Sequence, residues 1–533
     1  MEDEREDAAD AWQRAARFRA ELDEIYKYYF PFRKSTNERS PDTGGQSEGS
    51  SRTDHLFDAS GVVGGFNFAG QMVADWLPPF QDFFKVEAGE LVPDDQKQPL
   101  NLALGKATQL AHAFLRPQVQ LSANEMMADV FCGTGAMNLG STSSSKSPDG
   151  RPIRIESVPV NEIAIDNGAF GGVGGVWWKK KYKARHMEER WPDGKFSDAF
   201  AAELKKNRKA EFTVTQSTRW DPNEGRWLLR VYCDGSSDDA FHQEWMRTKP
   251  WVTPRFFLVP GESMGRGLAH LGLAFVKSAN KARELALRAA AFALMGIWMR
   301  RNDGVFNPDT AVFQPLAMWT VASTGGPLGP SLSRLPVPQD FDVQSIVMKD
   351  ERDQINKILL NDDLPELQDS VRSPTEIAAR LRKLSKSKGG AASRLSVELI
   401  GDLVQRTFDI LEQQNLIQGS QIKIDNFATK VTITSPAAAA QRSDKVEWAT
   451  SWMQIVAGTM GPQALPSLIK VDDLLSDIGR WLGNEEKYMP TEQDKKEFRD
   501  VVASMVAKMQ LEAAQAKEKP PAPGSQQVNG SAY

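Results

Sequence analysis

The most chemically suggestive stretch of the chain is rich in glycine and ends in lysines. Residues 168–181 are GAFGGVGGVWWKKK, with five glycines among the first eight. Such a loop can cradle a phosphate when its last glycine opens a helix. Here the β-branched and aromatic run VWWKKKYKA follows, which indicates a strand. The sequence therefore predicts a flexible turn into a strand, with Trp177 and Trp178 on opposite faces, one of them in the core, and the lysines on a solvated edge.

Other motifs for nucleotide binding or nucleophilic catalysis are absent from the sequence. The nearest approach to a P-loop is Gly105-Lys106, but Ala107 follows in place of a hydroxyl residue and the upstream glycine is missing. A G-x-S-x-G nucleophile elbow is not present. The run CGTGAMNLG at 132–140 lies between a helical pattern and a polar loop, which favours a helix C-cap and turn.

Metal ligands are equally sparse. The histidines are His55, His112, His186, His242 and His270. None is paired with a His or Cys at zinc-ligand spacing. Adjacent acids such as Asp472-Asp473 could hold a metal, but acid pairs are common on solvated surfaces and none stands in a nuclease pattern. We therefore predict no catalytic, metal-binding or cofactor-binding residue.

Length and charge limit the function further. The 533 residues suffice for three or four domains, and the net charge of −5 argues against a protein that coats DNA. Positive charge is confined to three clusters. They are Lys179–Lys181 with Lys183 and Arg185; Lys205, Lys206, Arg208 and Lys209; and Arg380, Arg382, Lys383, Lys386, Lys388 and Arg394. We expect the first two to be solvated, and the third to lie beside an assembly of long helices.

The same composition predicts a soluble protein of a reducing cytoplasm. Two cysteines are too few for a disulfide framework. The acidic start MEDEREDAAD has no apolar core, so it is not a signal peptide. The longest apolar run, Ala289–Met299, is well short of the roughly 20 residues of a membrane span.

Apolar residues at helical spacing predict a mainly helical chain with a β-rich middle. The first helices are expected over residues 11–29, 60–77 and about 100–131, with prolines ending the first two. Between 151 and about 260, short β-rich runs separated by Asp-Gly pairs predict an antiparallel module with a small helix at Ala184–Trp191.

A long helix, a small β insert and a returning helix follow. The first is the alanine-rich segment Leu268–Arg301, unusually long for a compact domain. Residues 302–340 carry two short β-rich runs, and Asp342–Leu360 forms the second helix. The remaining expectations are helices over 375–387, 391–414 and 437–515, a hinge at Gly389-Gly390, a strand pair over 421–434 and a disordered end.

This order of elements resembles the head-to-tail connector, or portal, proteins of short-tailed (podovirus-type) bacteriophages. Four stretches in the right order carry the likeness, which covers roughly residues 11–500. They are HLFDASGVVGGFNFAGQMVADWLPPFQDFF at 55–84, GRGLAHLGLAFVKSANKARELALRAAA at 265–291, SPTEIAARLRKL and GGAASRLSVELIGDLVQRTFDILEQQNLI within 373–417, and VDDLLSDIGRWLG at 471–483.

The resemblance implies an α+β, mainly helical portal fold assembled as a ring. Its parts would be a wing with a β-rich module from about 151, stem helices, a β-rich clip, a tunnel loop and a helical crown. The ranges are 1–265 for the wing, 266–301 and 341–363 for the stem helices, 302–340 for the clip, 364–374 for the tunnel loop, 375–436 for the channel-side long helix and wing return, 437–515 for the crown and 516–533 for a disordered tail.

It also implies partners and a place in the virion. A ring of identical subunits, normally twelve, would occupy one capsid vertex and pass double-stranded DNA during packaging and ejection. Terminase and then tail adaptor or nozzle proteins would dock on it, with major capsid, scaffolding and internal core proteins around it. The protein would reside in the virion, and in the host cytoplasm during assembly, without a membrane, a cofactor or catalysis of its own. The lysines after Trp178 would then be a solvated edge or a contact to a neighbouring subunit.

Nine residues are candidates for contact with DNA under this resemblance. The tunnel-loop candidates are Leu367, Gln368, Asp369, Ser370 and Arg372, and the DNA-channel candidates are Arg380, Lys383, Lys386 and Arg394. For the basic residues, a solvated outer face or inter-subunit ion pairs is an equal alternative. A metal-dependent nuclease or other phosphodiesterase of the virion, using Asp472 and Asp473, is the alternative function. A tail adaptor is disfavoured because such proteins are usually far shorter.

Overall fold

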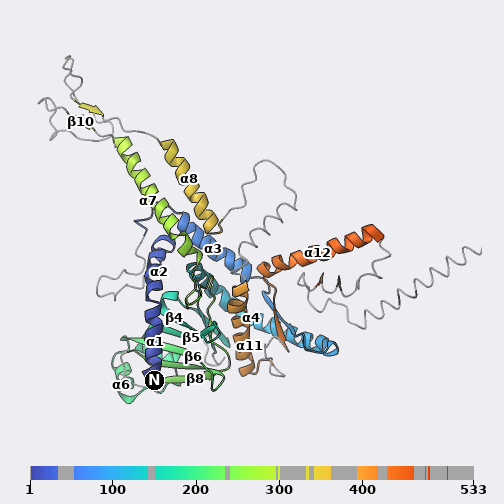
Figure 1. Ribbon diagram of the computed structural model, residues 1–533. Helices are drawn as coiled ribbons and strands as arrows, with labels where there is room; N and C mark the ends of the chain where they lie inside the picture. The colour runs from blue at the N-terminus through green and yellow to red at the C-terminus, as the bar shows by residue number, and fades with distance from the viewer. Residues whose placement is uncertain are drawn as a thin grey trace, which may run out of the picture.

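The computed structural model shows a body of helices and sheets from which one pair of helices projects (Figure 1). It describes residues 2–33, 53–141, 151–234, 240–295, 298–300, 332–334, 341–361, 393–417 and 429–460, with 474–475, 478–479, 501 and 504. The fold is α+β, as predicted from the sequence.

The helices and strands alternate in blocks along the chain. The helical elements are α1 (Glu2–Arg14), α2 (Ala16–Tyr29), α3 (Ser60–Trp76), α4 (Asp94–Cys132), η2 (Val160–Glu162), α5 (Ala184–Arg190), α6 (Asp198–Lys206), α7 (Leu268–Met295), α8 (Phe341–Ile358), η3 (Ser396–Gly401), α11 (Asp402–Gln413) and α12 (Pro436–Met460). The strands are β1 (Phe84–Ala88), β2 (Met137–Ser141), β3 (Ile153–Ser157), β4 (Ile163–Asn167), β5 (Val173–Lys183), β6 (Glu211–Asp221), β7 (Arg226–Cys233), β8 (His242–Met246), β9 (Trp251–Val252), β10 (Trp298–Arg300), β11 (Leu332–Arg334) and β12 (Thr429–Ile433).

The predicted β-rich module is confirmed as an antiparallel sheet in the order β4-β5-β6-β7-β8. One face of this sheet is covered by α1, whose Ala8 and Ala11 pack with Trp177 of β5. The other face is covered by α5 and α6, whose Met187 and Leu204 pack in the cluster that contains Val214 of β6. The predicted helix at Ala184–Trp191 is thus present as α5.

Both tryptophans of the glycine-rich stretch are buried, although only one was expected in the core. Trp177 is 2% exposed beneath α1, and Trp178 is 1% exposed on the opposite face, where its ring lies edge-on to that of Trp251. The prediction failed because α1 covers the face that was expected to be solvated. Gly171, at φ +81°, makes the turn before β5. The strand is second in the sheet rather than at an edge.

The lysines of β5 are held by acids of the same chain. Lys179 lies 3.1 Å from Asp234, and Lys180 pairs with Glu156. These contacts replace the solvated edge expected for the two residues, while Lys181 is exposed.

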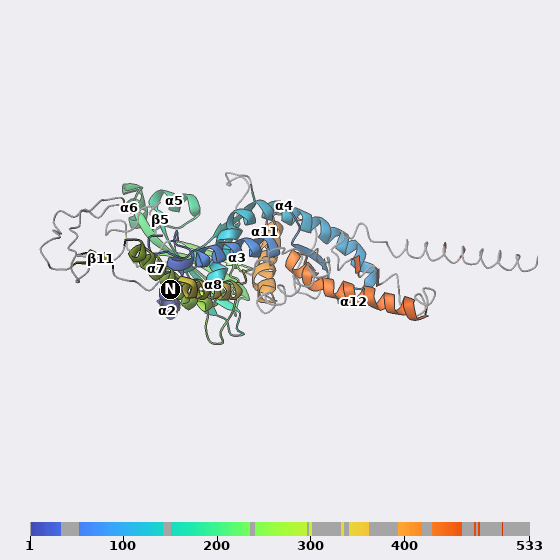
Figure 2. The same ribbon diagram turned by 90° about the horizontal axis from the view of Figure 1, so that it is seen from above.

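The main core joins α2, α3, α4, η3 and α11 with the first turns of α7. Phe131 near the end of α4 stands at its centre, in ring contact with Tyr29, Phe30 and Phe68. Figure 2 shows α4 as an arch, which follows from Pro117 in its interior, because proline removes one helical hydrogen bond. The helices predicted over 60–77 and about 100–131 are confirmed. No helix among the described residues is long and apolar enough to cross a membrane.

The N-terminal helical region differs from the prediction of one helix over residues 11–29. Helix begins at Glu2 and is interrupted at Ala15, which separates α1 from α2. The acidic start folds because its carboxylates find arginines on the sheet. Glu4 lies 2.7 Å from Arg230, and Asp7 lies 2.6 Å from Arg219.

The sequence predicted that the long helix would end at Arg301, but it ends at Met295. Trp298–Arg300 instead forms β10, which pairs antiparallel with β11. The sequence has Gly296 directly after the helix, and glycine is the poorest helix former after proline. The returning helix is confirmed as α8, which packs beside α7 (Figure 1). Most of 302–340 lies outside the described residues.

The structure adds detail to two local predictions. Thr429–Ile433, the second half of the predicted strand pair, is a strand and pairs with β1, Phe84 standing opposite Ile433, while residues 421–428 lie outside the described residues. Residues 132–140 hold the predicted C-cap, Gly133 at φ +125°, but continue into β2 rather than a turn. The partner of β12 lies too far away in the sequence for a local pattern to reveal it, whereas β2 pairs with the next strand, β3, and with the distant β9.

Candidate functional site

Most of the residues predicted to meet DNA lie outside the described residues. These are all five tunnel-loop candidates, Leu367, Gln368, Asp369, Ser370 and Arg372, and three DNA-channel candidates, Arg380, Lys383 and Lys386. The hinge at Gly389-Gly390 and the acids Asp472 and Asp473 lie outside as well. Arg394 is described, directly after Ser393, where the described chain resumes. The candidate site is therefore built from the residues that flank 362–392.

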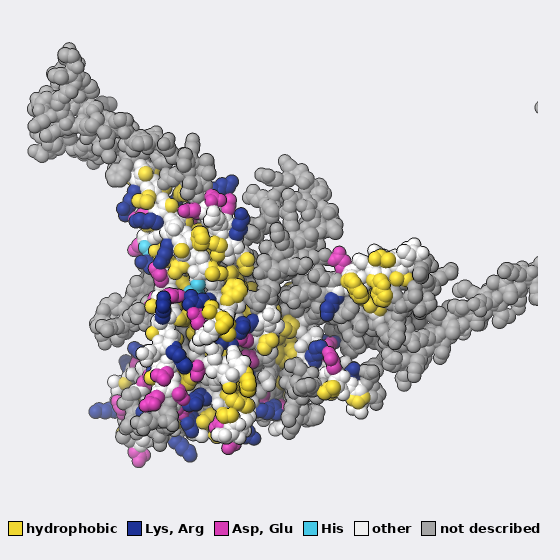
Figure 3. Space-filling model, in the orientation of Figure 1, with side chains coloured by type: hydrophobic (Ala, Val, Ile, Leu, Met, Phe, Trp, Pro, Cys, Tyr) yellow, Lys and Arg dark blue, Asp and Glu magenta, His cyan; other side chains and the backbone are white. Residues whose placement is uncertain are grey.

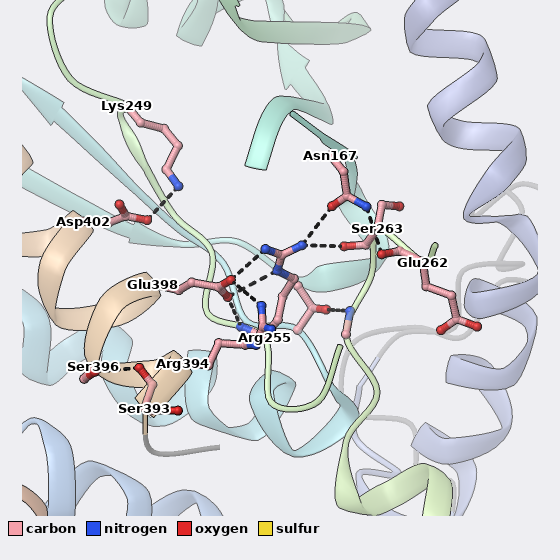
Figure 4. A network of polar contacts seen from close by, with 12 residues as sticks. Asn167, Lys249, Arg255, Glu262, Ser263, Ser393, Arg394, Ser396, Glu398 and Asp402 are labelled. Atoms are coloured by element: carbon pink, nitrogen blue, oxygen red, sulfur yellow. Dashed lines mark hydrogen bonds and ion pairs between the residues drawn. The ribbon is translucent and has the colours of Figure 1, made fainter. Parts of the chain in front are cut away.

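On the C-terminal side of that segment, Arg394 and the buried Arg255 share one carboxylate, that of Glu398 (Figure 4). Glu398 accepts from Arg255 Nη2 at 2.7 Å, from its Nε at 3.2 Å and from its backbone N–H at 3.0 Å. Arg394 Nη1 donates to Oε1 of the same carboxylate at 3.0 Å. Since the Arg255 side chain is 0% exposed, Glu398 provides its main charge compensation.

The remaining nitrogen of Arg255 ties this pair to the β-rich module. Arg255 Nη1 donates to Asn167 Oδ1 at 3.0 Å and to the carbonyl oxygen of Ser263 at 3.3 Å. Asn167, the last residue of β4, in turn donates to the carbonyl oxygen of Glu262 at 3.0 Å. One guanidinium therefore connects β4, the segment before α7 and the helix that carries Glu398.

Glu398 stands in a π-helical turn, η3, which precedes α11. Such turns carry one extra residue and occur often at functional sites. Leu399 and Ile400 of this turn are fully buried in the main core, which leaves Glu398 beside Arg255. The sequence predicted helix over 391–414; from Ser393 onward this is confirmed, with the π-helical turn as the feature that the pattern did not reveal.

Further ion pairs continue along α11 toward its C-terminus. Lys249 lies 2.7 Å from Asp402, and Arg406 Nη1 lies 3.2 Å from Asp409. Burial raises the pKa of Asp402 against the attraction of Lys249. Burial likewise lowers the pKa of Arg406 against the attraction of Asp409. These pairs and the Arg255–Glu398 pair form one row, the α11 seam, which consists of Lys249, Arg255, Glu398, Asp402, Arg406 and Asp409.

None of the six residues of the α11 seam was predicted from the sequence. A signal was nevertheless present, because Glu398, Asp402 and Arg406 recur every fourth residue in a helix whose other positions are largely apolar. Charges at that spacing share one helix face. Their partners on the 246–255 segment could not be identified without the fold.

On the N-terminal side of 362–392, polar contacts join α3, α7 and α8. Asp58 accepts from Arg352 of α8 through Nη2 at 2.7 Å and Nε at 2.9 Å. Asn280 of α7 accepts from the backbone N–H of Asp58 at 3.1 Å. Just beyond α8, Asn361 accepts from Asn67 of α3 at 2.9 Å. The chain is thus held by specific contacts on both sides of the predicted tunnel-loop segment.

An open hollow of about 300 Å³ lies beside the α11 seam. Its lining is Arg226, Trp245, Arg247, Asp409, Glu412 and Gln413. Arg247 is already paired, 2.9 Å from Asp409 and in contact with Glu412. Among the described residues, no three His, Cys, Asp or Glu side chains lie close enough to hold a metal ion.

The fold thus defines an α+β protein in which the helix pair α7–α8 projects from the body. Polar contacts fix the chain before residue 362 and after residue 392. The chain belongs to the family described as bacteriophage head to tail connecting protein, whose model matches residues 4–489. This confirms the resemblance found in the sequence, and it gives no support to a nuclease.

Two solved structures are similar to the chain at low identity. One, titled "Virion of native gene transfer agent (GTA) particle", has 11% identity and a TM-score of 0.33 over 76% of this chain and 88% of the other. The second, "Neck of empty GTA particle computed with C6 symmetry", has 10% identity and a TM-score of 0.33 over 81% of this chain and 92% of the other. A search of curated proteins found no match.

Proposed function

We propose that the chain forms a closed ring of identical subunits, twelve in number, at one vertex of a phage capsid. Double-stranded DNA passes through the ring during packaging and ejection. Membership of the head to tail connecting family supports this role. The observation that carries the proposal is the order α7, β10–β11, α8, in which two packed helices project from the body and a small sheet closes their far end.

Exposed apolar residues on α7 support assembly with further copies. Leu271, Phe275, Leu285 and Leu287 are 42–58% exposed. Apolar side chains lie open to solvent along the projecting helices in Figure 3. Packing of such a surface against a neighbour removes apolar area from water, which stabilises the assembly. The α7–α8 pair therefore acts as the stem, and neighbouring subunits cover its apolar side chains.

The charge balance suits a channel that conducts DNA without retaining it. A uniformly basic wall would bind phosphates strongly through counterion release. This chain has a net charge of −5, and Arg394 at the end of the candidate channel segment is paired with Glu398. Weak and local contacts with DNA are the consequence.

The parts of the chain take the places that the family resemblance implies. Residues 1–265 form the wing, 266–301 and 341–363 the stem helices, and 302–340 the clip. Residues 364–374 form the tunnel loop, 375–436 the channel-side helix and wing return, and 437–515 the crown, followed by the tail at 516–533. Terminase docks on the clip and is later replaced by tail adaptor or nozzle proteins. Capsid, scaffolding and internal core proteins contact the remaining surfaces in the virion and, during assembly, in the host cytoplasm.

Electron microscopy and native mass spectrometry of the purified full chain test the ring. We expect closed rings with a central opening and a mass that is twelve times that of the subunit. A particle that remains monomeric at every protein and salt concentration would contradict the proposal. Particles assembled without this chain should contain no packaged DNA.

A further inference from the structure

Two basic stretches that lie apart in the sequence meet at one end of the five-stranded sheet. The backbone N–H of Ala184 donates to the carbonyl oxygen of Ala210 at 2.9 Å, which joins the start of α5 to the chain that follows α6. Five exposed cations gather around this contact, and they form the α6 cation surface. They are Arg185, Lys205, Lys206, Arg208 and Lys209.

The cations of the α6 cation surface have no ion-pair partner in the part of the chain that the structure describes. Within residues 203–211, the exposed acids Glu203 and Glu211 stand against four exposed cations, which leaves an excess of positive charge there. Side chains of the lysine and arginine type lie at the edge of the molecule where α6 is placed (Figure 3). Mutual repulsion among these cations would be relieved by an anionic partner.

Helix α1 carries negative charge that is likewise unpaired. Its inward acids, Glu4 and Asp7, are used to hold the helix on Arg230 and Arg219. Glu6 and Asp10 are exposed and have no ion pair among the described residues. Because they are four residues apart, they share one face of the helix and repel each other. Glu6 and Asp10 form the α1 acid surface.

The two charged surfaces lie on opposite sides of the same sheet. Successive side chains of a strand point to opposite faces. In β6, Ser217 donates to Glu4 of α1 at 2.8 Å, whereas Val214 packs with Leu204 of α6. Figure 2 shows the N-terminus on one side of the sheet and α5 and α6 on the other. A subunit therefore presents negative charge on one side and positive charge on the other.

We propose that the α6 cation surface of one subunit binds the α1 acid surface of the next subunit in the ring. A ring of identical subunits requires head-to-tail contacts between two different surfaces of each subunit. Complementary charges on opposite sides of the sheet meet that requirement and fix the direction in which subunits join. A second copy is favoured over nucleic acid because the complementary surface belongs to this chain, whose net charge is −5. The inference rests on the ring proposed above.

Charge reversal in the full-length protein tests the contact. Lys205→Glu with Lys206→Glu, or Glu6→Lys with Asp10→Lys, places like charges against each other at every junction. Each double variant should need a roughly tenfold higher protein concentration to form rings at low salt. The fourfold variant restores opposite charges and should assemble close to the wild-type concentration. Native mass spectrometry over a dilution series gives the fraction of subunits in rings.

Control experiments distinguish loss of this subunit contact from misfolding and from failure of the proposed ring. Lys106→Glu, which reverses an exposed lysine on α4, should leave assembly unchanged. At a dilution at which the wild type is also dissociated, all variants should unfold at the same temperature. Double variants that assemble like the wild type, or a fourfold variant that does not recover, would overturn the inference while the ring stands. Normal rings that lose affinity for a double-stranded DNA fragment in Lys205→Glu/Lys206→Glu would overturn it too, by assigning the surface to nucleic acid. A monomeric wild-type chain would overturn the proposed function itself.

Discussion

Arg255 and Glu398 form a two-point ion pair although 143 residues separate them in the sequence. The arginine precedes α7 on the side of the β-rich module, and the glutamate precedes α11. Their contact fixes the start of the helix at which the described chain resumes after residue 392. This pair and the Lys249–Asp402 pair both connect the helix that is described from Ser393 onward to the β-rich module.

Removal of the negative charge from Glu398 should be strongly destabilising. Glu398→Gln leaves the Arg255 guanidinium buried without a counter-ion, and removal of one partner of a buried pair costs about 3–5 kcal/mol. Urea unfolding gives the change in the free energy of unfolding. Glu412→Gln, whose carboxylate contacts the 44% exposed Arg247, should cost at most about 1 kcal/mol. Equal destabilisation of the two variants would contradict the central role of Arg255.

The contact of Asp58 with α8 should make stability depend on pH. Burial acts to raise the pKa of Asp58, but hydrogen bonds from Ser60 and Arg352 outweigh it and hold the pKa below 3.8. The folded state therefore favours the carboxylate, whose stabilising effect is complete above pH 3.8 and disappears as the pH falls through the folded-state pKa.

Asp58→Asn should accordingly lower the free energy of unfolding by about 1–3 kcal/mol at neutral pH. Paired denaturation curves for wild type and variant should converge as the pH falls below 3.8. A difference that grows with acidity would show that the carboxylate is not preferentially ionised in the folded state.

Two glycines should respond to alanine in opposite directions. At Gly267 an added Cβ would lie 2.0 Å from the carbonyl oxygen of Phe131 and 2.5 Å from the nitrogen of Gly133, so Gly267→Ala should cost about 3 kcal/mol. At Gly105, inside α4, the Cβ would meet nothing within 4 Å, and alanine should stabilise by about 0.5–1 kcal/mol. Thermal unfolding of both variants tests this, and a stable Gly267→Ala protein would contradict the close crossing of α4 and the start of α7.

Arg394 is expected to behave differently from the other basic channel candidates. Because the charge of Arg394 is already paired with Glu398, Arg394→Gln should leave DNA retention unchanged. Removal of an ion pair between side chains four residues apart costs only about 0.2–0.5 kcal/mol of stability. Joint neutralisation of Arg380, Lys383 and Lys386 to Gln should preserve rings but reduce packaged DNA. It should also lower the salt dependence of DNA binding by about one unit of slope for each phosphate that is no longer neutralised. Unchanged packaging in the triple variant would remove these residues from the channel.

Local patterns predicted the elements that depend on local physics. The double proline after α3 ended that helix where expected, and the β-branched and aromatic run VWWKKKYKA predicted the strand β5. The predicted first helix began only at residue 11, because six carboxylates among the first ten residues resemble a solvated segment. Helix forms there because Arg219 and Arg230, over 200 residues away, neutralise two of the carboxylates. Only the fold could bring these charges together.

Of the described residues of the candidate site, the sequence predicted only Arg394, because the other contacts join segments that are distant in the chain. Arg394 stood out within a basic cluster, but Glu398 gave no sign that it would face the buried Arg255. A basic cluster in a sequence predicts exposed side chains. Here Arg394 of the cluster instead contacts the carboxylate of Glu398, which also forms the ion pair of the distant Arg255. The two basic stretches of the α6 cation surface were likewise predicted as separate clusters, since the connection that joins them spans a whole helix.

The pairing of β1 with β12 sets the order in which the protein can fold. Thr432 donates to Glu87 across this small sheet, and the two residues are 345 positions apart in the chain. At about 5–20 residues per second, the ribosome needs roughly 20–70 s to synthesise that distance. Throughout this time β1 lacks its partner strand, so this sheet cannot form. A chain that stops short of β12 therefore cannot form this sheet, and Phe84–Ala88 then has no partner strand.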